Sequence, residues 1–154
     1  MRRVLLLVST ATLAASAQTY TGPRPTQSDL PYIKHADHLV ATEALTTKEQ
    51  RKGSETVYTM DGACSTARTP LALPIFLLLA DKLNPDDLGL YRLESKEGHR
   101  ELVLRAGKRP DAIGLEVKHL DGKLYWIETD DTLDPGEYAL SPQGSNQAFC
   151  FTVF

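Results

Sequence analysis

Residues 133–154 read LDPGEYALSPQGSNQAFCFTVF, and this C-terminal stretch is the most informative one about the fold. It contains two mainly apolar segments, 137–141 and 148–154, joined by a polar connection with one proline and one glycine. In the second segment, apolar side chains recur at every second position, namely Phe149, Phe151 and Val153. Because successive side chains of a strand point to opposite faces, this spacing predicts a strand with one face in a core. The stretch therefore predicts a pair of β-strands.

Short segments of the same kind continue toward the N-terminus, separated by turn residues. Their spacing predicts strands over residues 39–44, 56–60, 74–80, 88–95, 100–105, 113–119 and 124–128. The basic stretch 48–52 is interrupted by Glu49, and we expect it to be a solvated turn. Seven to nine short strands predict an all-β fold, either an antiparallel sandwich or a barrel.

The six residues from Leu133 to Tyr138 resemble the tyrosine-corner motif of Greek-key β-sandwiches, Leu-x-Pro-Gly-x-Tyr. The resemblance implies an immunoglobulin-like antiparallel sandwich in which Pro135 and Gly136 shape the crossover between sheets. Leu133 would fill the core, and the Tyr138 hydroxyl would bond back to the backbone upstream. Trp126, on the preceding strand, is expected in the core. The second residue after Tyr138 is not cysteine, so the inter-sheet disulfide of antibody domains is not implied.

At a broader level the chain resembles a set of uncharacterised secreted bacterial proteins. The similarity is carried by four short stretches, LPY at 30–32, HAD at 35–37, RTPL at 68–71 and SPQGSNQ at 141–147. No activity is known for that family, so the resemblance implies an exported β-sandwich and no site residue.

The first seventeen residues have the organisation of a secretory signal peptide. Arg2 and Arg3 precede the mostly apolar run 4–13, and Ala15-Ser16-Ala17 provides a small-x-small cleavage signature. We therefore expect a signal peptide over 1–17, an extended proline-rich lead-in over 18–37 and one β-sandwich domain over 38–154. The expected location is secreted or periplasmic.

The charge of the chain argues against nucleic acid as a partner. Lys and Arg number 17 against 20 Asp and Glu, and loss of Arg2 and Arg3 with the leader would leave 15 against 20. Phosphate binding depends on clustered Lys and Arg, which this chain lacks. After the leader, the longest apolar run has ten residues, 71–80, and contains a proline, whereas a membrane-spanning helix needs about 20. The sequence predicts no membrane span there, and a protein or glycan partner of unknown identity.

Two cysteines, Cys64 and Cys150, leave two alternatives open. In an oxidising compartment they could form a disulfide, which would close a long loop and stabilise the fold by roughly 4 to 5 kcal/mol. Alternatively, Cys150 is a buried thiol in the last strand and Cys64 a thiol in a loop. Their spacing matches neither a redox motif nor a metal site.

Two clusters contain side chains that can bind metals. His35, Asp37 and His38 form the first, and they could converge on a metal ion if they lie on a turn. On an extended strand, His35 and Asp37 would share a face and His38 would point away. The second cluster is acidic, with Asp130, Asp131 and Asp134 as conceivable calcium ligands that do not match an EF-hand loop. For both clusters, a polar turn is the simpler interpretation, so no metal and no cofactor is expected.

No catalytic residue is predicted. The chain has no Gly-x-Ser-x-Gly elbow, phosphate-binding loop or dinucleotide-binding turn. The paired carboxylates at 86–87 and 130–131 fall in predicted loops, where solvation is the ordinary outcome. We therefore expect a non-catalytic secreted or periplasmic domain with a binding or structural role. The alternatives are a metal-binding protein that uses His35, Asp37 and His38, and a carbohydrate-binding module that uses exposed aromatic residues such as Tyr125.

Overall fold

The computed structural model describes residues 19–108 and 111–154. The expected signal peptide, residues 1–17, lies outside this part. The described chain consists of strands apart from one short 3-10 helix, η1 (Pro85–Asp87). The strands are β1 (Tyr32–Lys34), β2 (Leu39–Ala41), β3 (Glu43–Thr46), β4 (Lys48–Lys52), β5 (Glu55–Asp61), β6 (Arg68–Thr69), β7 (Ile75–Leu79), β8 (Leu88–Lys96), β9 (His99–Arg105), β10 (Leu115–Asp121), β11 (Leu124–Thr129), β12 (Gly136–Pro142) and β13 (Gln147–Val153).

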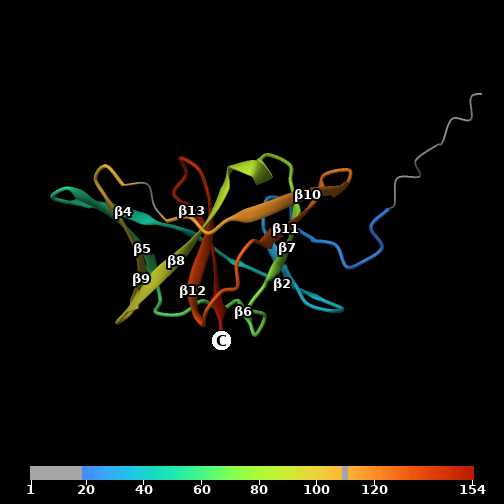
Figure 1. The fold of residues 1–154 in the computed structure, drawn as a ribbon, viewed down its shortest axis with the longest axis horizontal. Helices are drawn as coiled ribbons and strands as arrows, with labels where there is room; N and C mark the ends of the chain where they lie inside the picture. The colour runs from blue at the N-terminus through green and yellow to red at the C-terminus, as the bar shows by residue number, and fades with distance from the viewer. Residues whose placement is uncertain (1–18, 109–110) are drawn as a thin grey trace, which may run out of the picture.

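The strands form two sheets, and all pairings between them are antiparallel except the short contact between β6 and β13. The first sheet has five strands in the order β10-β11-β7-β1-β2. The second has the order β3-β13-β12-β8-β9-β5-β4, with β6 added beside β13. Figure 1 shows β4, β5, β8 and β9 on one side of the C-terminal hairpin β12–β13, and β7, β10 and β11 on the other. The predicted all-β sandwich of antiparallel sheets is confirmed.

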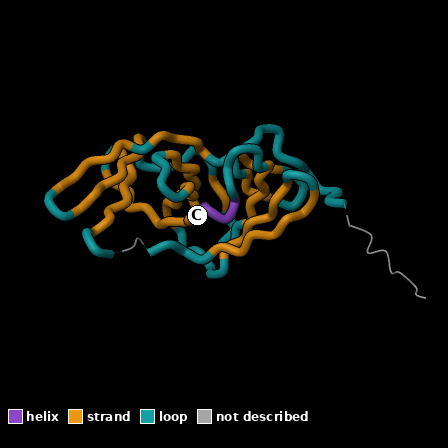
Figure 2. The backbone as a smooth tube through the Cα atoms, turned by 90° about the horizontal axis from the view of Figure 1, so that it is seen from above, coloured by secondary structure: helices purple, strands orange, loops and turns teal. Residues whose placement is uncertain are grey.

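The second sheet curls round on itself. Its two end strands, β3 and β4, are separated in the chain only by Thr47, so one extended segment pairs with β13 through its first half and with β5 through its second. Seen from above in Figure 2, the strands fall into two groups with the C-terminus between them. The concave face of the curled sheet therefore encloses a space of its own, separate from the core between the two sheets.

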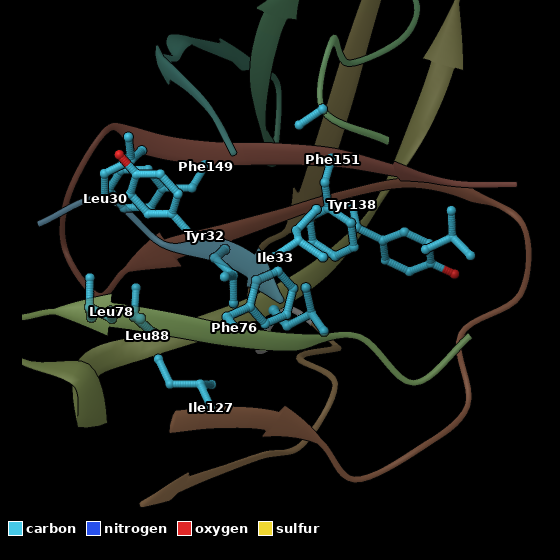
Figure 3. Packing of buried hydrophobic residues seen from close by; sticks show 14 of the residues in the cluster. Leu30, Tyr32, Ile33, Phe76, Leu78, Leu88, Ile127, Tyr138, Phe149 and Phe151 are labelled. Carbon is cyan, nitrogen blue, oxygen red and sulfur yellow. The ribbon is translucent and has the colours of Figure 1, made fainter. Parts of the chain in front are cut away.

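The main core lies where the five-stranded sheet packs against β8, β12 and β13. Phe76 contributes from the first sheet, and its ring meets the ring of Phe151 edge to face with centroids 5.1 Å apart. Tyr138 stacks on the other side of Phe151 at 5.6 Å (Figure 3). Ile33 and Ile127 complete the layer and are both fully buried. Aromatic pairs at these distances stabilise a core beyond the apolar area they bury.

Strands β12 and β13 are buried on both faces, which explains their nearly continuous apolar sequences. Phe149 and Phe151 point into the main core, whereas Ala148 and Cys150 point into the space enclosed by the curl. Ala139 faces the same enclosed space from β12. A strand covered on both faces carries apolar residues at consecutive positions, and β13 does so from 148 to 151, in addition to the larger side chains at every second position.

The tyrosine-corner stretch has the local geometry that the resemblance implies. Tyr138 donates a 2.8 Å hydrogen bond to the backbone oxygen of Asp134, four residues upstream. Leu133 is buried in the main core. Arg92 donates to the Tyr138 hydroxyl at 2.8 Å and to the backbone oxygen of Pro135 at 3.0 Å, so it joins the corner to β8.

Three expectations differ from the structure. The lead-in expected over 18–37 contains β1, which lies between β7 and β2 with Ile33 fully buried, so the sandwich begins before residue 38. The stretch expected as a solvated turn, 48–52, is strand β4, whose side chains are all exposed while its backbone pairs with β5. Trp126 is only half-buried and lies on the opposite face of β11 from the core residue Ile127.

The segment before β1 is held against the sheet by Asp29. Its carboxylate accepts backbone hydrogen bonds from Asp81, Lys82 and Leu83 at 2.8 to 3.2 Å. Asp29 itself has φ 59°, in the left-handed region that Asp tolerates better than most residues.

Within the described residues, no helix is long and apolar enough to cross a membrane.

Candidate functional site

The curled sheet encloses a pocket of about 370 Å³, here called the lumen pocket. Its floor is apolar and consists of Met60, Leu93, Leu102, Leu104, Ala139 and Ala148. Its rim is mostly polar and contains Thr47, Glu49, Ser141, Gln143, Ser145 and Asn146. Two aromatic residues, Tyr58 and Tyr91, together with Pro142 and Gly144, complete the lining. The combination of an apolar floor and a few polar groups at the mouth is typical of a small-molecule site.

The period of two along each strand explains why these side chains meet. Leu102 and Leu104 alternate with outward residues on β9, as Tyr58 and Met60 do on β5. The extended segment that forms β3 and β4 contributes Thr47 in the same phase. The curl turns the corresponding faces of all these strands inward, so residues distant in the chain share one surface.

Arg100 closes the far end of the curl. It is fully buried, and its guanidinium donates to the backbone oxygens of Asp61 and Gly62, each at 2.9 Å. It also donates to the carboxylate of Glu43 at 2.9 Å and lies 3.7 Å from that of Glu137. A buried charge is tolerated when it is paired and its donors are satisfied, and Arg100 meets both conditions.

Glu137 is also satisfied within this network. Its two oxygens accept hydrogen bonds from the backbone N–H of Ser65 at 2.9 Å and from the Thr152 hydroxyl at 2.7 Å. Two carboxylates and one guanidinium therefore occupy the end of the curl with their hydrogen-bonding capacity largely used. This end is a structural plug rather than an open reactive site.

Cys150 lies between the plug and the floor of the lumen pocket. Its thiol is fully buried and approaches the Met60 sulfur at 3.6 Å. Burial raises the pKa of Cys150 to about 12, so the thiol is protonated and unreactive at neutral pH. Cys64 is exposed, and both cysteines are free thiols. Of the two alternatives, the structure therefore has the buried thiol and the loop thiol, and the disulfide is not formed.

At the open end, Tyr91 and the β12–β13 connection shape the mouth. The Tyr91 ring lies over Gly89, where an added Cβ would come within 2.5 Å of the tyrosine hydroxyl oxygen. Glycine at this position therefore allows the ring to line the lumen pocket. The connection is held by two backbone bonds, from Gln143 N–H to Asp87 O at 2.9 Å and from Thr47 N–H to Asn146 O at 2.7 Å.

The predicted metal candidates lie elsewhere. Residues 35–38 form the turn between β1 and β2, closed by a bond from the His35 N–H to the His38 oxygen. The two imidazole rings stack at 4.8 Å, and His38 Nδ1 lies 2.8 Å from the Asp37 carboxylate. The side chain of Asp37 is used in this local contact. Within residues 19–108 and 111–154, no three His, Cys, Asp or Glu side chains are arranged to hold one metal ion.

The acidic and aromatic candidates are also separate from the lumen pocket. Asp131 and Asp134 border a separate pocket of about 470 Å³ beside Arg92, and Asp130 packs against Gly114. Tyr125 is half-buried and meets the His119 ring edge to face at 5.2 Å. It does not line the pocket that Tyr58 and Tyr91 share.

Sequence reasoning missed the lumen pocket and its plug. One available signal was the phase of β9, in which Arg100 shares a face with the apolar residues Leu102 and Leu104. An arginine on an apolar face indicates a buried ion pair when a carboxylate can reach it. No local sequence pattern indicates that Thr47 lines the pocket.

Comparison with known proteins gave no match to a family model, to a curated protein or to a solved structure.

Proposed function

We propose that this chain is an exported, non-catalytic β-sandwich domain that binds a small, mainly apolar molecule in the lumen pocket. The observation that carries the proposal is an apolar-floored pocket of about 370 Å³ inside a sheet whose opposite face is closely packed. The apolar floor, rather than the volume, distinguishes this pocket, since the pocket beside Arg92 measures about 470 Å³ and has four charged residues in its lining. A pocket at the mouth of a curled sheet is a common place for a ligand.

The chemistry around the pocket supports binding rather than catalysis. The thiol nearest the floor, Cys150, is protonated because burial raises its pKa to about 12. The charged groups beyond it already have partners. Arg100 donates to two backbone oxygens, and Glu137 accepts from a backbone N–H. No proton donor, acceptor or nucleophile among these three is free to act on a bound molecule.

Export is the second part of the proposal. It rests on the signal-peptide pattern of residues 1–17 and on the resemblance to secreted bacterial proteins. The test is the intact mass of the protein recovered from outside the cytoplasm. We expect a chain that begins near Gln18, and recovery of chains that retain Met1 would contradict export by a cleaved leader.

A carbohydrate is the second candidate ligand, because two tyrosine rings and two side-chain amides line the same pocket. Tyr58 and Tyr91 could stack on a sugar ring, and Gln143 and Asn146 could bond its hydroxyls. The apolar floor favours a hydrocarbon instead, since a sugar would place several hydroxyls against side chains that cannot bond them.

Binding can be measured with N-phenyl-1-naphthylamine, an uncharged dye that fluoresces in apolar sites. We expect saturable enhancement with the purified protein. Ala148→Leu places a larger side chain on the floor and should weaken binding by at least about tenfold, because it takes up space that the dye would occupy. Ala44→Leu is the matched control, since Ala44 is exposed on the neighbouring strand β3.

Three results are informative. Saturable dye binding that Ala148→Leu abolishes and Ala44→Leu preserves supports the proposal. Equal binding by both variants would show that the dye sits elsewhere and would overturn it. Failure of the dye to bind, together with binding of simple hexoses lost in Tyr58→Ala, would favour the carbohydrate alternative.

A further inference from the structure

Strand β4 divides its charged side chains between its two faces. Glu49 lines the lumen pocket, whereas Lys48 and Lys52 line a different pocket on the outer face of the sheet. The strand register places Glu49 opposite Tyr58, and Tyr58 opposite Leu102 on the next strand. Residues that are directly opposite one another share a face, with Cβ atoms about 4.5–5.5 Å apart. Glu49 is therefore a neighbour of an aromatic residue and of the apolar floor.

The Glu49 side chain is exposed and has no cationic partner. No ion pair within residues 19–108 and 111–154 includes it. Glu49 is the one charged residue in the lining of the lumen pocket, so no Lys or Arg shares that lining. Arg51, the next residue of β4 in the same phase, borders a separate pocket together with Glu55. A positively charged group on a ligand could therefore pair with Glu49 at the mouth.

The far end of the lumen also carries a net negative charge. The extended segment of β3 and β4 has Glu43 in the same phase as Glu49, and Glu43 belongs to the plug. There the carboxylates of Glu43 and Glu137 accompany a single guanidinium, that of Arg100. Charges interact more strongly across a poorly solvated interior than across water. An anion in the lumen pocket would meet negative charge at both ends, whereas a cation would be attracted.

The two tyrosines of the lining add a feature that suits a cation. A tyrosine ring attracts an ammonium group over its face, and Tyr58 and Tyr91 both line the lumen pocket. The floor, in contrast, offers only apolar side chains and Met60, none of which can pair with a charge. A charged group would therefore stay at the mouth, and the apolar remainder of the molecule would occupy the floor.

We propose that the ligand of the lumen pocket is an apolar amine, a small hydrocarbon skeleton with one ammonium group, and that Glu49 selects it. The ammonium group pairs with the Glu49 carboxylate beside Tyr58, and the skeleton rests on Leu93 and Leu102. This inference rests on the proposed binding function and adds the chemical class of the ligand and the residue that recognises it.

The test uses three probes of similar length, each competing with the naphthylamine dye at neutral pH: 2-phenylethylamine, propylbenzene and 3-phenylpropanoate. The wild-type protein should bind the amine more tightly than the carboxylate. Glu49→Gln keeps the size of the side chain and removes its charge. It should weaken binding of the amine about two- to fivefold, the range expected for one exposed ion pair, and leave propylbenzene binding unchanged.

A matched variant and a change of salt accompany the test. Glu97→Gln removes the same charge from the hairpin between β8 and β9, outside the lumen pocket, and should alter no affinity. Salt at about 1 M screens exposed charges, so it should reduce the difference between wild type and Glu49→Gln for the amine. Melting curves of both variants establish that they are folded.

The outcomes separate the two proposals. If neither the dye nor any probe binds, the proposed function fails. If the dye and the probes bind but Glu49→Gln changes the amine and propylbenzene equally, or changes neither, the binding function stands and the selection of an amine by Glu49 is wrong. An equal loss of amine binding in Glu97→Gln, or tighter binding of 3-phenylpropanoate than of the amine by the wild type, would also overturn the inference.

Discussion

Replacement of Arg100 by methionine should be among the most destabilising single changes in this protein. Arg100 is fully buried, and methionine has a similar length but no charge and no donor. The change leaves two backbone oxygens and the carboxylates of Glu43 and Glu137 without their guanidinium partner. Removal of one member of a buried ion pair typically destabilises by about 3–5 kcal/mol.

The exposure of the remaining groups places the effect within that range. Glu137 is 6 % exposed and keeps its bonds to Ser65 and Thr152, whereas Glu43 is 18 % exposed and can regain some water. We therefore expect a loss of about 4 kcal/mol, close to a thousandfold change in the ratio of folded to unfolded protein. Domains of this size are stable by only about 5–15 kcal/mol, so much of the stability would be lost.

Urea unfolding measures the effect, with the fluorescence of the single tryptophan, Trp126, as the signal. Arg105→Met is the matched control, because Arg105 lies on the same strand and forms an exposed ion pair with Glu55 at 3.3 Å. An exposed pair contributes less than about 1 kcal/mol. Glu43→Gln in the Arg100→Met background should restore part of the loss. Equal destabilisation by Arg100→Met and Arg105→Met would refute the argument.

Three other residues make separate predictions. Burial by itself would raise the pKa of Asp29. The three backbone N–H groups that donate to its carboxylate lower the pKa by more than burial raises it, so the pKa lies below the ordinary 3.8. A carboxyl whose pKa is lowered by folding contributes stability that is fully present above about pH 4 and is lost as the pH falls through the folded-state pKa. Asp29→Asn should therefore reduce the free energy of unfolding at pH 7 and make its decline in acid less steep. Urea unfolding from pH 2 to 7 measures both effects. Tyr138→Phe should lose about 1–2 kcal/mol in thermal unfolding because the bond to the Asp134 oxygen disappears, and an unchanged melting temperature would contradict the structural role of the corner. A thiol reagent should titrate Cys64 in the native protein and Cys150 only after unfolding, since one thiol is exposed and the other buried; a native protein with no reactive thiol would instead indicate a disulfide.

The strands could be predicted because their evidence is local. The predicted strand 56–60 lies within β5 (Glu55–Asp61), and 100–105 lies within β9 (His99–Arg105). Apolar side chains at every second position need no knowledge of the partner strand. The corner at Tyr138 is similarly local, because its hydrogen bond reaches only four residues back.

The missed elements have long-range causes. Strand β4 reads KEQRK and buries no side chain, so it exists only because its backbone pairs with β5. The lumen pocket depends on β3 and β4 pairing with β13 and β5, strands that lie on opposite sides of the curl. Such pairing uses backbone N–H and C=O groups that every residue carries, and it therefore leaves no pattern in the side chains.

The amino-acid sequence alone determined that this chain forms antiparallel strands with apolar faces, and which residues of each strand share a face. The tertiary structure decided what each face meets: the same alternation places Phe149 in the core between the sheets and Ala148 in the lumen pocket. It also decided that Arg100 is buried beside Glu43. The reason is that the period of two along a strand determines which face of the sheet a side chain lies on. What that face packs against depends on how the sheet curls, and the curl results from backbone pairing between segments that are distant in the chain.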